Sequence, residues 1–387
     1  MKKDLNVIAD VPSHTLRDAM PLPAVSMAAL RSRDAAALEA LEASLGSVGF
    51  VHLVDHGIDE ETLGALAAAR AFFELDDGAK MKAAHARKGF IPVNGCVNAV
   101  RPPHLHEKFS CGRLAGSFKD GDPYYCGQSD EAKLYFGDDN RWPEDGDAPG
   151  FRTAYEAAYR AFEGLCSDLH SVIAASLGLE PDFFSTALSK HVTNLCALHY
   201  PGRRGDLSHA SDDHASATAP AAPPSEVAAA AAAADADERV HPHTDPTSLT
   251  VLYHENGDAS GLQVLIDDAA GGAEWTDVGW RPGALIVNVG DILHFWTNGR
   301  LKSARHRVLG RGWCSRLSLI YFCMPGYDTP IEAPEALCGG APARYPRFLC
   351  GQRSHFAQGL RDRQGLPDRQ LLTAQGNPGA PPANERE

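Results

Sequence analysis

His243 and Asp245, separated by a single threonine, have residue types and a spacing that suit metal binding. In an extended strand, residues i and i+2 project from the same face, so an imidazole and a carboxylate can reach one ion from one strand end. His241 would share that face, and it could instead be a ligand, a hydrogen-bond donor to a ligand, or a solvent-facing residue. His243 is favoured because only it has a carboxylate two residues later, which gives a mixed nitrogen and oxygen ligand set.

A third ligand must come from elsewhere in the chain, and the candidate is His306, in the segment Ser-Ala-Arg-His-Arg-Val. Two neutral imidazoles and one carboxylate on one face of an octahedral ion leave three positions open. This suits Fe(II), because a chelating co-substrate and O2 need vacant positions. Structural zinc sites usually recruit cysteine, and none lies near His243. An isolated His-x-Asp often arises by chance, so it predicts a metal site only together with other residues.

Arg316 and Ser318 follow His306 and open an apolar stretch, residues 317–322, that has the character of a strand. On a strand the two side chains share a face, and a guanidinium fork beside a hydroxyl is suited to bind a carboxylate inside a barrel. The alternative is an arginine at a sheet edge, paired with a surface acid. The position of the pair, after both the His-x-Asp and His306, favours the carboxylate site.

The composition is that of a soluble globular protein, since 44% of the 387 residues are hydrophobic and 22% are charged. The net charge of −14 argues against a nucleic-acid or anionic-membrane partner, because both require a basic surface. The nine cysteines form no C-x-x-C pair, so we expect mostly buried thiols in a reducing compartment. The sequence shows no secretory signal and no apolar run near the roughly 18 residues of a membrane helix. The expected location is the cytosol.

Helices and strands must hold the candidate metal and carboxylate residues in position. The first half of the sequence predicts helices around one strand. Leucines at helical spacing predict a helix over residues 34–45 that stops at Gly46. Residues 50–54 form a short apolar strand, after which Asp59 is expected to cap another helix. Residues 150–178 carry apolar and aromatic side chains at helical spacing and predict a long helix.

After about residue 190 the pattern changes to short strands separated by turn signals, which favours a sandwich or jelly roll. Residues 202–239, with seven consecutive alanines, are interpreted as a low-complexity insertion between two strands. Residues 83–149 are rich in Gly, Pro and Asp, and we expect them to be mainly loops. The expected strands are residues 195–200, 248–253, 262–266, 284–289 and 315–324.

Several longer motifs accompany these residues. They are Gly49-Phe-Val-His-Leu-Val-Asp-His56-Gly57, Phe72-Phe73-Glu-Leu followed by Lys80, His243-Thr-Asp245-Pro-Thr-Ser-Leu-Thr, Gly261-Leu-Gln-Val264, Thr297-Asn-Gly-Arg-Leu-Lys-Ser303-Ala-Arg-His306-Arg-Val and Arg316-Leu-Ser318-Leu-Ile-Tyr-Phe322. With these motifs the chain resembles the 2-oxoglutarate- and Fe(II)-dependent dioxygenase superfamily, in the group that contains isopenicillin N synthase, gibberellin oxidases and flavonoid dioxygenases. The resemblance covers roughly residues 21–135 and 190–360.

The strand pattern and the resemblance together imply an α+β protein with a mainly β core. The expected fold is a double-stranded β-helix (jelly roll) with an N-terminal helical and mixed region and flanking helices. The expected divisions are a flexible lead-in over residues 1–20, an N-terminal dioxygenase-type domain over 21–135, a supporting helix over 150–178, a jelly-roll domain over 190–330 that contains the insertion 202–239, a C-terminal helical segment over 331–363 and a disordered tail over 364–387.

The resemblance also implies the residues of the site. The iron ligands would be His243, Asp245 and His306, and the distal carboxylate of 2-oxoglutarate would be held by Arg316 and Ser318. Tyr200 lies where the family often has a tyrosine in contact with the same co-substrate, although it could equally be a core aromatic. The family commonly has an asparagine where this chain has Leu198. The implied cofactors are Fe(II), 2-oxoglutarate and O2, with ascorbate as an activator in vitro.

Three functions remain open from the sequence. The leading one is an oxygenase that hydroxylates or desaturates a small organic substrate and converts 2-oxoglutarate and O2 to succinate and CO2. The second is an Fe(II) oxidase of the same fold that, like isopenicillin N synthase, does not need 2-oxoglutarate. The third is a non-catalytic jelly-roll protein that binds a metal. Substrate selectivity is expected in residues 83–149, the insertion and a C-terminal helix over 346–360. Phe295 and Trp296 could line the substrate site or belong to the core.

Overall fold

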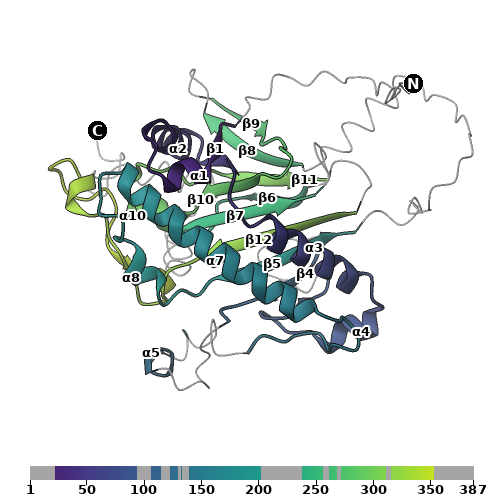
Figure 1. Cartoon of the computed structure of the whole chain (residues 1–387). Helices are drawn as coiled ribbons and strands as arrows, with labels where there is room; N and C mark the ends of the chain where they lie inside the picture. Colours follow the sequence, from purple (N-terminus) through teal and green to yellow (C-terminus); the bar gives the residue numbers. More distant parts are fainter. Residues whose placement is uncertain are drawn as a thin grey trace, which may run out of the picture.

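The computed structural model describes a subset of the chain (Figure 1): residues 22–93, 106–114, 123–129, 132, 139–201, 238–255, 261–267, 272–310 and 315–352. The lead-in, nearly all of the insertion, the tail and the C-terminal segment beyond residue 352 lie outside these residues.

An eight-stranded sheet forms the centre of the described structure (Figure 1). Its strands, in spatial order, are β1 (Ala24–Ser26), β2 (Phe50–Val54), β10 (Leu285–Val289), β7 (Leu249–His254), β12 (Arg316–Cys323), β5 (Asn194–Tyr200), β4 (Glu107–Cys111) and β3 (Phe90–Ile91). All neighbouring strands are antiparallel except the pair β1 and β2. The two edges of the sheet therefore come from the first third of the chain, and its centre comes from the second half.

A four-stranded antiparallel sheet covers part of the large one. Its strands are β6 (Glu238–His243), β11 (His306–Leu309), β8 (Leu262–Asp267) and β9 (Ala273–Asp277). A separate two-stranded sheet pairs β13 (Pro330–Ile331) with β14 (Phe348–Leu349). The two larger sheets face each other as a double-stranded β-helix, which confirms the predicted α+β class with a mainly β core.

The alternation of side chains gives the large sheet two different faces. On β12, Leu317, Leu319 and Tyr321 belong to the core that packs against the helices. Ile320 and Phe322 of the same strand belong to clusters between the two sheets. We call the face that carries Ile320 and Phe322, and that meets the four-stranded sheet, the interior face. Residues i and i+2 on any strand of the large sheet share one of these faces.

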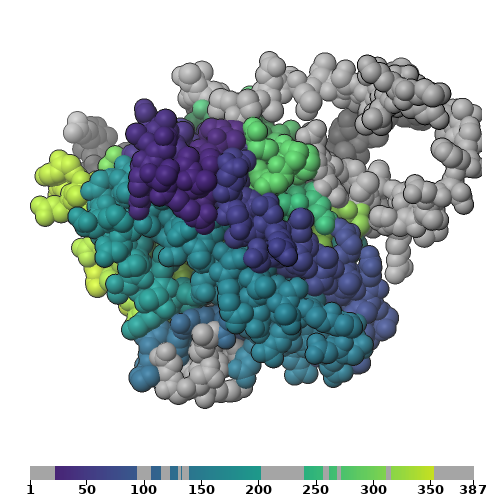
Figure 2. Space-filling model, viewed as in Figure 1, coloured from purple at the N-terminus to yellow at the C-terminus, as the bar shows by residue number. Residues whose placement is uncertain are grey.

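Helices cover the other face of the large sheet. The longest, α7 (Phe151–Ser176), buries a stripe of aromatic and aliphatic residues, and α3 (Asp59–Phe73) lies beside it. Figure 2 shows that this helical layer hides most of the sheet on that side of the molecule. The remaining helices are α1 (Met27–Arg31), α2 (Ala35–Ser47), α4 (Asp77–Lys82), α5 (Pro123–Cys126), α8 (Ser185–Leu188), α10 (Asp291–Trp296), η3 (Glu335–Leu337) and η4 (Cys350–Gln352).

Two predicted helix boundaries were wrong. Helix α2 continues through Gly46 to Ser47, and the chain turns at Gly49 instead. Gly49 has φ of +82°, and a Cβ there would lie 2.2 Å from the carbonyl oxygen of Lys302. Asp59 is the first residue of α3 rather than its cap, since Ile58 holds that position and no side chain caps the helix. The acidic first turn still stabilises α3 through the helix dipole.

The described parts of residues 83–149 are mainly loops, as expected, but they also contain β4, which is fully paired with β5 in the large sheet. The C-terminal segment differs from its predicted character. The described part of the C-terminal segment, up to residue 352, contains two short strands and two 3-10 turns rather than an α-helix. Phe295 and Trp296 belong to the helix-facing core. Among the helices described, none is both long and apolar enough to cross a lipid bilayer.

Candidate metal centre and carboxylate site

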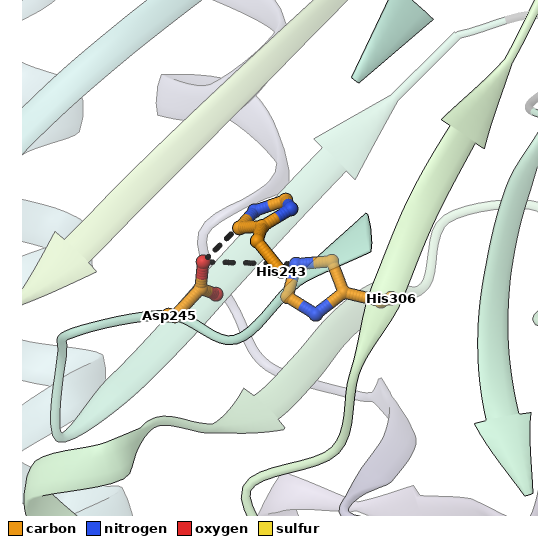
Figure 3. A group of neighbouring side chains, drawn as sticks. All are labelled: His243, Asp245 and His306. Atoms are coloured by element: carbon orange, nitrogen blue, oxygen red, sulfur yellow. Dashed lines mark ion pairs between the residues drawn. The ribbon is translucent and has the colours of Figure 1, made fainter. Parts of the chain in front are cut away.

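Strands β6 and β11 bring the two predicted histidine ligands together. His243, the last residue of β6, lies directly opposite His306, the first residue of β11, and Asp245 follows two residues after β6. Oδ1 of Asp245 lies 3.5 Å from Nε2 of His243 and 3.6 Å from Nε2 of His306. Figure 3 shows both imidazoles facing this carboxylate. One ligand atom from each residue lies within 4.8 Å of the others, a spacing at which a single ion can contact all three.

Backbone carbonyls orient both imidazoles. Nδ1 of His243 lies 2.8 Å from the carbonyl oxygen of His241, and Nδ1 of His306 lies 3.2 Å from that of Ala304. A ring nitrogen that donates to a carbonyl carries the proton, so Nε2 of the neutral ring keeps its lone pair for a metal. His241 therefore contributes a carbonyl that orients His243, and its own ring is not part of the cluster.

The carboxylate of Asp245 is held from the large sheet. Its Oδ2 accepts a hydrogen bond from Oγ1 of Thr250 at 2.7 Å and another from Nδ2 of Asn288 at 2.9 Å. Thr250 lies on β7 and Asn288 on the neighbouring β10, where the two residues are direct cross-strand partners. These bonds occupy Oδ2 and leave Oδ1 directed at the two imidazoles. Both sheets of the β-helix thus contribute to one cluster.

Electrostatics at the cluster favour the protonation states that bind metal. Burial alone would raise the pKa of Asp245, but the charge on His306 and His243 and the hydrogen bond from Asn288 outweigh it and hold this pKa well below its usual range. Burial, with the neighbouring charge of His243, lowers the pKa of His306 to about 4. Near neutral pH, Asp245 is therefore ionised and His306 uncharged, as metal ligation requires. Two imidazole nitrogens and one carboxylate oxygen form the ligand set typical of non-haem Fe(II) oxygenases.

Arg316 and Ser318 project from the interior face of β12, on the same side as each other, as the sequence predicted. Both are buried, with 8% and 1% of their surface exposed. Tyr200 lies directly opposite Arg316 on β5, and the guanidinium carbon lies 5.2 Å from the centre of the Tyr200 ring. Burial lowers the pKa of Arg316 from its usual value, but a guanidinium keeps its charge in proteins. A buried cation of this kind favours an anionic ligand.

His254 adjoins this carboxylate site and was missed in the sequence. It is the last residue of β7 and lies opposite Ser318. Within the described residues, Oγ of Ser318 and Nε2 of His254 are buried without a hydrogen-bond partner. Burial and the charge of Arg316 lower the pKa of His254 to about 4. Buried polar atoms without partners beside a guanidinium are arranged to contact a polar, anionic ligand.

Thr250 and Asn288, which orient Asp245, were also missed in the sequence. The only signal in the sequence for their position was the alternation of side chains, because Thr250, Leu252 and His254 must share one face of β7.

Leu198, where the family commonly has an asparagine, lies opposite Ser318 on the interior face. An aliphatic side chain at this point packs between the sheets and offers no hydrogen bond.

Comparison with known protein families identifies both halves of the chain. Residues 226–325 match the 2OG-Fe(II) oxygenase superfamily, and residues 22–145 match the N-terminal region of non-haem dioxygenases in morphine synthesis. Gibberellin 2-beta-dioxygenase 2 of Oryza sativa subsp. japonica is 32% identical over 88% of this chain and 84% of its own length. Proline hydroxylase buaE of Petromyces alliaceus is 30% identical over 79% of this chain and 86% of its own length.

A solved structure gives the same result for the fold. A full-length protein of Neurospora crassa, solved in complex with alpha-KG and 5-formyluracil, superposes with a TM-score of 0.65 at 21% identity. The superposition covers 89% of this chain and 97% of that protein. The gibberellin dioxygenase and the proline hydroxylase each match this chain over most of its length and most of their own. The double-stranded β-helix of this chain places a His-Asp-His cluster between its sheets. The chain therefore belongs to the 2OG-Fe(II) oxygenase superfamily and is a dioxygenase that uses Fe(II) and 2-oxoglutarate.

Proposed function

We propose that this dioxygenase hydroxylates or desaturates a small organic molecule at a centre formed by His243, Asp245 and His306. The observation that carries the proposal is the convergence of both Nε2 atoms on Oδ1 of Asp245, with the remaining polar atoms of the three side chains engaged by the protein. Bound Fe(II) would supply the redox chemistry, in which O2 and 2-oxoglutarate give succinate and CO2 and a substrate C–H bond is oxidised.

The protein residues have separate tasks in this proposal. Thr250 and Asn288 fix the carboxylate that faces the ion, so that little reorganisation is needed when the metal binds. Arg316 and Ser318 bind the distal carboxylate of 2-oxoglutarate, and the Tyr200 ring supports the guanidinium from the opposite strand. Burial of Arg316 strengthens its attraction for a carboxylate, because water competes less with the ion pair.

The location and the kind of substrate follow from the thiols and the net charge. We propose a cytosolic enzyme with a small-molecule substrate rather than a nucleic acid or a membrane. The seven cysteines in the described residues are all free thiols, as expected in a reducing compartment. The acidic net charge of −14 is unsuited to binding polyanions.

The direct test is formation of succinate coupled to loss of 2-oxoglutarate in the presence of Fe(II) and ascorbate. Wild type should show this reaction, and Arg316→Ala should need a much higher concentration of 2-oxoglutarate. Oxidation of a substrate by O2 at full rate without 2-oxoglutarate would overturn the co-substrate assignment. That result would instead favour an oxidase of the isopenicillin N synthase type with the same metal ligands.

A further inference from the structure

Strand β4 carries a lysine whose direction is set by its neighbours. Glu107 turns toward the helices, where its carboxylate accepts a hydrogen bond from Lys80 of α4 at 3.1 Å. Phe109 and Cys111 belong to the helix-facing core. Because successive residues of a strand point to opposite sides, Lys108 projects from the interior face.

Ser110, two residues after Lys108, confirms which side of β4 faces the interior. Sγ of Cys196 on β5 lies 3.4 Å from Oγ of Ser110 on β4. Cys196 packs with Ile320 in the cluster on the interior face. Ser110 therefore faces the space between the sheets, and Lys108, two residues earlier, lies on the same side.

The strand register places Lys108 near the carboxylate site but apart from it. Lys108 lies opposite Leu198 on β5, and Leu198 lies opposite Ser318 on β12. Neighbouring strands are about 4.8 Å apart, so the backbone of Lys108 is about 10 Å from that of Ser318. The ammonium group is thus a second cationic point beside the site assigned to 2-oxoglutarate, and Leu198 lies between the two.

The charges of this face are unbalanced in the described strands of the large sheet. Arg316 and Lys108 are the only arginine and lysine side chains on the interior face of these strands, and no carboxylate lies on the same face. Lys108 is half-buried, and its ammonium group makes no hydrogen bond or ion pair with the residues described. A partly desolvated ammonium gains from an anionic partner. If the co-substrate neutralises Arg316, then Lys108 is available to a second anion.

We propose that Lys108 binds a carboxylate of the substrate, so that this enzyme selects small organic acids over their neutral analogues. The inference rests on the proposed function, because it assumes that Arg316 holds 2-oxoglutarate. A single ammonium is a point charge that can pair with one carboxylate. Leu198 and the apolar residues of the neighbouring strands would contact the carbon skeleton of the acid.

The test uses a library of aliphatic, cyclic and aromatic carboxylic acids, each paired with its primary amide. Succinate formation from 2-oxoglutarate is measured with Fe(II) and ascorbate for wild type, Lys108→Met, Lys108→Arg and a control, Lys82→Met. Lys82 is half-exposed and pairs with Asp147 on the surface. The slow turnover of 2-oxoglutarate without substrate, and its KM, are measured in parallel for every variant.

We expect acids, and not their amides, to stimulate wild type and Lys82→Met. In Lys108→Met, kcat/KM for the best acid should fall by about 10- to 100-fold, as for a lost charged hydrogen bond, while the KM for 2-oxoglutarate stays unchanged. Lys108→Arg should keep the preference for acids. Equal stimulation by amides, no stimulation by any acid, or full activity of Lys108→Met with an acid would overturn the proposal. An increased KM for 2-oxoglutarate in Lys108→Met would do the same, since Lys108 would then serve the co-substrate.

The parallel measurement separates this inference from the proposed function. If wild type converts 2-oxoglutarate without substrate but shows no preference for acids, only the assignment of Lys108 fails. If wild type with Fe(II) converts no 2-oxoglutarate at all, the proposed function fails first.

Discussion

Asn288→Ala tests whether the large sheet tunes the metal centre. The substitution removes one of the two donors to Oδ2 of Asp245, the amide at 2.9 Å, and leaves Oγ1 of Thr250 at 2.7 Å. A hydrogen bond to a buried charged group contributes about 1.5–3 kcal/mol. We take about 2 kcal/mol, because Thr250 remains on the same oxygen. This corresponds to about a 30-fold increase in the Kd for Fe(II).

The measurement is anaerobic titration calorimetry with Fe(II), repeated with Mn(II), which does not react with O2 during handling. Thr250→Val should weaken binding by a similar factor. The double variant should lose less than the sum of the two, because both residues restrain one carboxylate. Thr153→Val, on the exposed side of α7, controls for the loss of a hydroxyl elsewhere. A Kd for Asn288→Ala within twofold of wild type, with an unchanged thermal midpoint, would refute the positioning role.

Three further outcomes follow from the structure. His243→Ala should abolish the 1:1 binding of Fe(II) in the same titration and leave the fold intact by circular dichroism; retention of one bound ion would exclude His243 as a ligand. Tyr200→Phe should keep the KM for 2-oxoglutarate within about threefold of wild type. Tyr200→Leu should raise this KM by about 3- to 10-fold, because the ring beside Arg316 is lost. A large effect of Tyr200→Phe would show that the Tyr200 hydroxyl, and not the ring, supports the co-substrate. Burial lowers the pKa of His170 to about 4 from 6.5, so the unfolded chain binds a proton first as the pH falls. The stability that His170 provides is complete above pH 6.5 and decreases by about 3 kcal/mol down to pH 4; urea unfolding of His170→Gln should show a smaller decrease over this interval, and an equal decrease would contradict the cause.

The position of the arginine and serine was predictable because alternation along a strand is local. Once residues 315–324 were identified as a strand, Arg316 and Ser318 had to share a face. Their meeting with Tyr200 depended on the register between β12 and β5, which no local pattern in the sequence specifies. The family resemblance supplied that information, and the structure agrees with the proximity.

The residues that orient Asp245 were not predictable for a different reason. Thr250 and Asn288 lie on strands whose composition is ordinary for a buried sheet. Their side chains reach the same Asp245 carboxylate only when β7 pairs with β10. His254 was missed because the predicted strand, residues 248–253, ended one residue before it. Strand β4 was missed because the surrounding residues 83–149 are rich in glycine, proline and aspartate, and composition averages over a short paired segment.

The sheet order has a consequence for synthesis of the protein. Strand β2, from the first part of the chain, is hydrogen-bonded to β10, which is made more than two hundred residues later. At translation rates of about 5–20 residues per second, β2 must wait roughly ten to fifty seconds for its partner. During that time its apolar residues, including Phe50 and Leu53, have only the three-residue strand β1 beside them and not the sheet in which they are finally buried. Folding of such a chain depends on contacts that are distant in sequence, so it should be slow, and the nascent N-terminal part should need a chaperone to keep it from aggregating.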